Sequence, residues 1–103
     1  MIMTHIRYSV KAEYAAQNKA NISRVMEELR ALRRTDIRYS FFVEDDGKTF
    51  NHWSLFANEE ARKVFGALES FKAFQAALPE DSREAPPTVT SLTPVDSSYD
   101  LFS

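Results

Sequence analysis

The sequence predicts a single α+β domain built from a four-stranded antiparallel sheet and two helices. Stretches in which apolar and polar residues alternate indicate strands, and stretches in which apolar residues recur every three or four positions indicate helices. The two kinds of stretch follow one another as strand, helix, strand, strand, helix, strand. A chain of 103 residues is the length of one domain, so we expect residues 1–103 to fold as a single unit.

The first third of the chain contains a strand and a long helix. The strand is predicted from Thr4 to Lys11, where every second residue is apolar. The helix is predicted from about Glu13 to Arg33, with one apolar stripe along its length and polar residues, Asn18 and Asn21 among them, on its other side. The stripe consists of Ile22, Val25, Met26, Leu29 and Leu32.

A hairpin is predicted next, with strands from Ile37 to Glu44 and from Thr49 to Ala57. The segment between them, Asp45-Asp46-Gly47-Lys48, is the best turn in the sequence. An Asp-Gly pair favours the positive φ angles of a tight hairpin, so the two strands must be antiparallel neighbours.

The second helix is predicted to be broken into two pieces. Asn58 is expected to cap its start, since an Asn side chain can accept a hydrogen bond from the first turn. The apolar pattern resets near Glu69, so Ser70 is expected to cap the second piece, and Pro79 is expected to end it. The last strand is predicted over Thr88–Val95.

Right-handed crossovers place both helices on one face of the sheet, which is the βαββαβ, ferredoxin-like arrangement. The other face has no second layer in a monomer, and Phe42 together with rings of the third strand would be exposed there. We therefore expect a homodimer. The C-terminal tail, residues 96–103, ends in the apolar side chains of Tyr99, Leu101 and Phe102. We expect it to dock on the partner, and the alternative is that it folds back over its own sheet.

Composition restricts the classes of function. The chain has no Cys, which excludes disulfides and thiolate chemistry. Its net charge of −2 disfavours nucleic acid as a partner. No stretch approaches the roughly 20 apolar residues of a membrane helix, and no signal peptide precedes the first strand, so a cytoplasmic protein is expected. Two His residues without a convergent carboxylate motif predict no metal site.

The chain resembles the dimeric α/β-barrel superfamily, and within it the antibiotic-biosynthesis-monooxygenase-like group. The resemblance covers roughly Thr4 to Val95. It rests on the element order, on the run Trp53-Ser54-Leu55-Phe56-Ala57-Asn58-Glu59-Glu60-Ala61 that leaves the hairpin, and on Ser70-Phe71-Lys72-Ala73-Phe74 in the broken helix. It implies a homodimer and, in part of the group, a cofactor-free oxygenase acting on quinol-like or polyketide aromatics.

The same resemblance argues against a haem-degrading enzyme. The His residues that some members carry on the second helix fall near Phe65 and Gln75 in this sequence, and neither position is His. A haem iron needs an axial ligand, so we expect no cofactor.

His52 is the candidate catalytic residue, because it and His5 are the only side chains of the type available for acid–base chemistry near neutral pH. Tyr8, Tyr39, Trp53 and Phe65 are expected to line the space between sheet and helices and to bind a small aromatic ligand. The alternative for these four residues is plain core packing.

Two functions remain open from the sequence. One is a cofactor-independent monooxygenase in which His52 is the base, Tyr8 or Tyr39 orients the substrate and Trp53 walls it in. The other is a non-catalytic homodimer that binds a small apolar ligand or supports a partner. The face of the third strand that meets the helices is not determined by the sequence.

Overall fold

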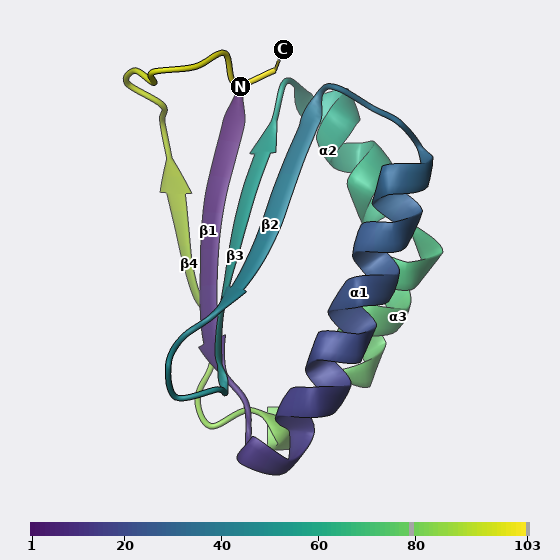
Figure 1. The fold of residues 1–103 in the computed structure, drawn as a ribbon, viewed down its shortest axis with the longest axis vertical. Helices are drawn as coiled ribbons and strands as arrows, with labels where there is room; N and C mark the ends of the chain where they lie inside the picture. Colours follow the sequence, from purple (N-terminus) through teal and green to yellow (C-terminus); the bar gives the residue numbers. More distant parts are fainter. Residues whose placement is uncertain (79, 103) are drawn as a thin grey trace.

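The computed structural model describes residues 1–78 and 80–102. Within them, one antiparallel sheet has the strand order β2-β3-β1-β4, and Figure 1 shows the helices on one side of it. The strands are β1 (Ile2–Ser9), β2 (Ile37–Val43), β3 (Thr49–Phe56) and β4 (Thr88–Leu92). The helices are α1 (Ala15–Ala31), α2 (Glu59–Gly66) and α3 (Glu69–Ala77), with short 3-10 turns η1 (Ala12–Tyr14) and η2 (Glu80–Ser82). The predicted α+β, ferredoxin-like fold is confirmed.

Most predicted boundaries shift by a few residues. β1 ends at Ser9, and Val10 then leaves the ladder to donate its N–H to the carbonyl of Lys48 at 2.9 Å. The first helix begins with the 3-10 turn η1 and ends at Ala31, just before Arg33, whose φ of 54° lies in the left-handed region that terminates helices. Local patterns predict where an element exists more reliably than where it stops.

The break in the second helix is confirmed, but its cap differs from the prediction. Asn58 caps α2 as expected, accepting the N–H of Ala61 at 2.9 Å. The prediction that Ser70 caps α3 is wrong, because Leu68 holds the N-cap position and has no side-chain hydrogen bond there. The N–H and the hydroxyl of Ser70 both donate instead to Glu28 of α1. A carboxylate from the neighbouring helix therefore satisfies a free N–H in the first turn of α3.

The C-terminal part is shorter in regular structure than predicted. β4 ends at Leu92, ahead of Pro94, and all five of its residues are exposed at the edge of the sheet. Pro79, predicted to end the second helix, and Ser103 lie outside the described residues. No helix formed by residues 1–78 and 80–102 has the length and apolar character needed to cross a membrane.

The strand register determines which side chains meet the helices. Ile6 pairs with His52 and Phe41 pairs with His52 from the other side, so the even-numbered residues of β1 and β3 share a face with the odd-numbered residues of β2. This helix face holds the core, with Tyr8, Ile37, Phe50 and Phe56 buried. The opposite face, which we call the open face, carries His5, Arg7, Arg38, Phe42, Asn51 and Trp53.

The chain has two Gly residues, and they provide a matched test of the turn. Gly47 has φ of +75° in the hairpin, whereas Gly66 lies in α2, and an added Cβ meets nothing within 4 Å at either. We expect Gly47→Ala to lower the free energy of unfolding by about 1 kcal/mol, because a side chain disfavours positive φ. We expect Gly66→Ala to raise it by about 0.5 kcal/mol through helix propensity.

Urea denaturation of the two variants and of the unchanged protein measures both effects. Equal effects of the two substitutions would contradict the assignment of a strained turn at Gly47.

Candidate functional site

A cavity of about 260 Å³ opens between the sheet and α3. The central strands contribute Tyr8, Tyr39 and His52 to its lining, α3 contributes Phe74 and Gln75, and the segment before β4 contributes Arg83. Ligand pockets usually measure roughly 300–1,000 Å³, so this cavity lies just below that range and suits a small, flat ligand. Its walls are mainly aromatic, with a few polar groups that can orient a ligand.

His52 is the polar centre of this cavity. Its side chain is only 3% exposed, and its ring lies 4.1 Å from the ring of Phe41 and 5.7 Å from that of Phe74, centroid to centroid. Nε2 lies 2.8 Å from the hydroxyl of Tyr8, and Nδ1 lies 3.5 Å from the hydroxyl of Tyr39. Burial, with a smaller contribution from the electrostatic interaction with His5, lowers the pKa of His52 to about 3. The imidazole is therefore neutral at pH 7.

The two Tyr residues are also held in their neutral forms. Burial raises the pKa of Tyr8 well above its usual range, although the hydrogen bond from Asn18 and the charge of Arg83 oppose this. Burial raises the pKa of Tyr39 in the same way. Around His52 the protein thus presents neutral hydroxyls and rings, with the guanidinium of Arg83 as a cation in the lining.

Phe65 lies between sheet and helices as predicted, but behind the cavity. It is 3% exposed, and its ring stacks on that of Tyr39 with centroids 4.3 Å apart and planes at 13°. Tyr39 lines the cavity and Phe65 supports it from the core side. Phe65 therefore packs against a ring that lines the cavity and is not itself part of the lining.

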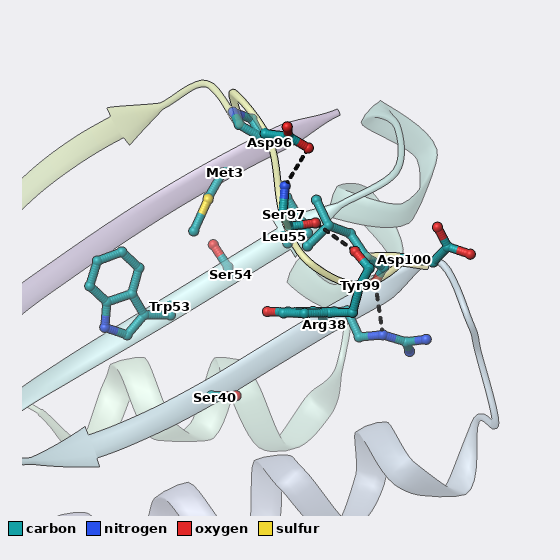
Figure 2. A pocket seen from close by; sticks show the side chains of 12 residues that line it. Met3, Arg38, Ser40, Trp53, Ser54, Leu55, Asp96, Ser97, Tyr99 and Asp100 are labelled. Atoms are coloured by element: carbon teal, nitrogen blue, oxygen red, sulfur yellow. Dashed lines mark hydrogen bonds between the residues drawn. The ribbon is translucent and has the colours of Figure 1, made fainter. Parts of the chain in front are cut away.

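Trp53 lies on the open face, so the prediction that it lines the space between sheet and helices is wrong. It is an odd-numbered residue of β3, one position from His52, and successive residues of a strand point to opposite faces. Figure 2 shows Trp53 in a different pocket, of about 530 Å³, between the open face and the C-terminal tail. There the tail lies against its own sheet, and Arg38 Nε donates to the carbonyl of Leu101 at 3.2 Å.

The open face also carries a polar network. The ring of His5 stacks on Trp53 with centroids 4.1 Å apart, and its Nε2 lies 2.6 Å from Asn51 Oδ1. Asn51 donates to Glu44 at 2.8 Å, and Glu44 in turn accepts two hydrogen bonds from Arg7. His5 and His52 therefore belong to separate networks on opposite faces of the sheet.

Sequence reasoning missed Asn18, which was assigned to the polar side of the first helix. The structure buries both Asn18 and Asn21, and Asn18 is completely inaccessible. A signal was present, because positions 18, 22 and 25 are spaced by four and three and so share the face of Ile22 and Val25. Arg83 gave no signal, since it belongs to an irregular segment. Among residues 1–78 and 80–102, no three His, Asp or Glu side chains gather as metal ligands.

The fold and the cavity define a ferredoxin-like α+β protein with an aromatic pocket beside its central strands. Solved structures of this architecture are similar over most of the chain. A Bacteroides thetaiotaomicron protein, provisionally named an antibiotic biosynthesis monooxygenase, has a TM-score of 0.81 at 16% identity and covers 96% of this chain and 93% of its own. A Caulobacter crescentus protein with the same provisional name has a TM-score of 0.76 at 20% identity, with coverages of 92% and 90%.

A third structure, named antibiotic biosynthesis monooxygenase outright, has a TM-score of 0.73 at 17% identity and covers 93% of this chain and all of its own. At these identities the likeness establishes the fold, so the resemblance found in the sequence is confirmed at that level. No family model and no curated protein matches the sequence.

The buried state of His52 makes stability depend on pH. In the unfolded chain its pKa is about 6.5, and in the folded protein it is about 3. Between these values the unfolded state binds the proton and the folded state does not, so stability falls as pH falls below 6.5. We expect the free energy of unfolding to be about 2 kcal/mol lower at pH 5.0 than at pH 7.5.

Urea denaturation at pH 5.0, 6.0 and 7.5 measures this loss. The range stops above the pKa values of Glu28, Glu44, Asp36 and Asp46, which hydrogen bonds hold below their usual range. His52→Gln should abolish most of the dependence, and His5→Gln should retain it. A wild-type stability that does not change across this range would contradict a neutral, buried His52.

Proposed function

We propose that this protein is a cofactor-independent monooxygenase-like enzyme acting on a small aromatic of the quinol or polyketide type. The observation that carries the proposal is the position of His52, a neutral imidazole hydrogen-bonded to Tyr8 in the wall of an aromatic-lined cavity. The names of the similar structures support the same class of chemistry. A cytoplasmic location stays part of the proposal.

The reaction needs no external reductant, because the substrate supplies the electrons. For an anthrone-type substrate, a base removes one proton from the ring CH₂ and leaves a carbanion. The carbanion reacts with dioxygen to form a carbon–oxygen bond and a peroxide anion, which takes the proton back from the protonated base and becomes a hydroperoxide. Loss of water from the hydroperoxide gives the ring carbonyl, so one oxygen atom of dioxygen enters the product and the other leaves as water.

His52 is the proton acceptor in this scheme. An imidazole whose pKa is about 3 in the empty cavity is a weak base, but the anion formed beside it stabilises the imidazolium directly. An opposite charge within about 4–6 Å favours the charged form of a group, and the effect is larger where water is excluded. Arg83 in the same lining favours the substrate anion, and Tyr8 or Tyr39 orients its oxygen. Trp53, on the opposite face, has no part in walling the substrate.

Dioxygen uptake with anthrone and hydroxyquinol tests the proposal. We expect uptake by the wild-type protein and a loss of about 10²–10⁴-fold in kcat for His52→Ala, the usual contribution of a general base. We expect kcat/KM to stay constant from pH 8 to pH 5, because the free imidazole does not protonate until pH approaches 3.

His5→Ala is the matched control, since it removes the other His and leaves the cavity intact. Equal uptake by wild type and His52→Ala would exclude His52 as the base. An inflection of kcat/KM near pH 6.5 would show a base in an ordinary aqueous environment.

We further propose that the enzyme is a homodimer that buries the open face of each sheet. Phe42 on this face is 56% exposed and Leu92 is 38% exposed, and the stacked pair of His5 and Trp53 lies on the same face. An antiparallel sheet with helices on one side leaves its other side for water or for a second layer. Rings exposed together on such a face are typical of an interface. The C-terminal tail lies against its own sheet in the single chain, and we propose that in the dimer it docks on the second copy instead.

Phe42→Glu should convert the dimer to a monomer in size-exclusion chromatography with light scattering, because it places a charge in the interface. Val89→Glu is the control, since Val89 is 62% exposed but pairs with Ile6 and so lies on the helix side of the sheet. A wild-type protein that runs as a monomer at micromolar concentration would contradict the homodimer.

The alternative is a non-catalytic homodimer that binds a small aromatic ligand in the same cavity. The tight contact of His52 with Tyr8 favours it, because a hydrogen-bonded, low-pKa imidazole can serve binding alone. A ligand at a hundred times its Kd adds about 2.7 kcal/mol to stability, and each kcal/mol raises Tm by about 4–8 °C in a small domain. A rise in Tm with anthrone but no dioxygen uptake would establish this alternative.

A further inference from the structure

A buried polar chain connects α1 to the wall of the cavity. Asn18 has no exposed surface, and its Nδ2 donates to the hydroxyl of Tyr8 at 3.0 Å. That hydroxyl lies 2.8 Å from Nε2 of His52. The other end of the amide, Asn18 Oδ1, is buried without a hydrogen-bond partner in the described part of the chain. Buried polar groups are nearly always hydrogen-bonded, so a buried amide whose nitrogen is bonded and whose oxygen is not needs an explanation.

The direction of each hydrogen bond in this chain follows from what each group can donate. Asn18 Nδ2 only donates, so the oxygen of Tyr8 accepts there and its own proton points to His52. His52 Nε2 then accepts, and the neutral ring carries its proton on Nδ1. Nδ1 meets the hydroxyl of Tyr39 across a long 3.5 Å contact, so it is the nitrogen for which a ligand in the cavity can compete.

Rotation of the Asn18 amide by 180° would reverse the direction of both hydrogen bonds that link Asn18, Tyr8 and His52. Oδ1 would accept the proton of Tyr8, Tyr8 would accept from Nε2 of His52, and Nδ1 would present a lone pair. Among Asn18, Tyr8 and His52 the two arrangements contain the same two hydrogen bonds, with donor and acceptor exchanged in each. The identity of the atom that Asn18 turns toward Tyr8 therefore decides the tautomer of His52.

We propose that Asn18 is a positioning residue that, through Tyr8, sets which nitrogen of His52 carries the proton. The amide orientation of the structure gives the Nδ1–H tautomer, which donates a hydrogen bond to a ligand oxygen. The reversed orientation gives the Nε2–H tautomer, whose Nδ1 can take a proton, so the base role proposed for His52 requires these hydrogen bonds to reverse when a substrate binds. The catalytic meaning of this choice rests on the proposed function, whereas the tautomer itself exists in the protein without a substrate.

Nitrogen-15 NMR of the His side chains at pH 7.5 tests the inference. The chain has two His residues, and a His5→Gln spectrum assigns them. We expect wild-type His52 to show a pyrrole-type shift at Nδ1 and a pyridine-type shift at Nε2. In Asn18→Asp the carboxylate can only accept from Tyr8, so the two shifts should exchange and the proton should move to Nε2. A wild-type proton on Nε2, or no exchange in a folded Asn18→Asp, would overturn the inference.

Asn18→Leu is the second variant, because a buried carboxylate can prevent folding. It removes both ends of the amide, and His52 should then show averaged shifts from a mixture of tautomers. Unchanged wild-type shifts in Asn18→Leu would equally overturn the inference. The matched control is Asn21→Leu, on the same helix and 6% exposed, whose amide contacts Tyr14 rather than Tyr8; it should leave the shifts of His52 as in the wild type.

Dioxygen uptake is measured separately on the same samples, so the two proposals fail independently. Exchange of the shifts without any uptake would support the role of Asn18 and remove the monooxygenase. Uptake by the wild type, with a His52 tautomer that does not respond to substitution of Asn18, would support the monooxygenase and remove the role of Asn18.

Discussion

The burial of His52 is the constraint on which the cavity depends. An imidazole at 3% exposure is tolerated only if it is neutral and hydrogen-bonded, because an unpaired buried polar group costs about 1–3 kcal/mol. The hydroxyl of Tyr8 satisfies Nε2, and the sheet makes this possible by placing Tyr8 and His52 on adjacent strands of the same face. Asn18 then satisfies Tyr8 from the helix layer. The polar site is thus a consequence of how one His is accommodated in an aromatic core.

Because successive side chains of each strand point to opposite faces, the sheet separates the helix face from the open face. On β3, His52 faces the helices and its neighbour Trp53 faces the open side. A shift of one residue in the register would exchange them and would place the Asn51 network in the core. The strongest constraint on the register is therefore the polar network of the open face, since Arg7, Glu44 and Asn51 could not be buried without large desolvation costs.

The sequence predicts the fold well because its information about the fold is local and repeated. The first two strands alternate, the hairpin has its Asp-Gly turn, and Asn58 caps α2 three residues before its partner Ala61. The site is predicted only in part. His52, Tyr8 and Tyr39 come together as expected, but Trp53 does not, because large side chains occur on both faces of β3 and periodicity alone cannot rank the faces. The burial of Asn18 could be predicted from its spacing to Ile22 and Val25. Its hydrogen bond to Tyr8 and the bond of Ser70 to Glu28 join separate elements, so no local pattern contains them.

The same reasoning explains why α1 matters to a cavity that it does not line. α3 forms one wall of the cavity, and side chains of α1 and η1 fix both of its ends. Glu28 accepts from Ser70 at the N-terminal end of α3, and Tyr14 donates to the carbonyl of Ala77 at the C-terminal end. Asn18 lies on α1 between these two contacts and holds Tyr8. Because α1 is one continuous helix of 17 residues, it couples the position of the α3 wall to the position of the polar chain. A ligand that displaces α3 must therefore also strain the helix that carries Asn18. Under the proposed role of Asn18, the shape of the cavity and the proton on His52 then depend on the same element.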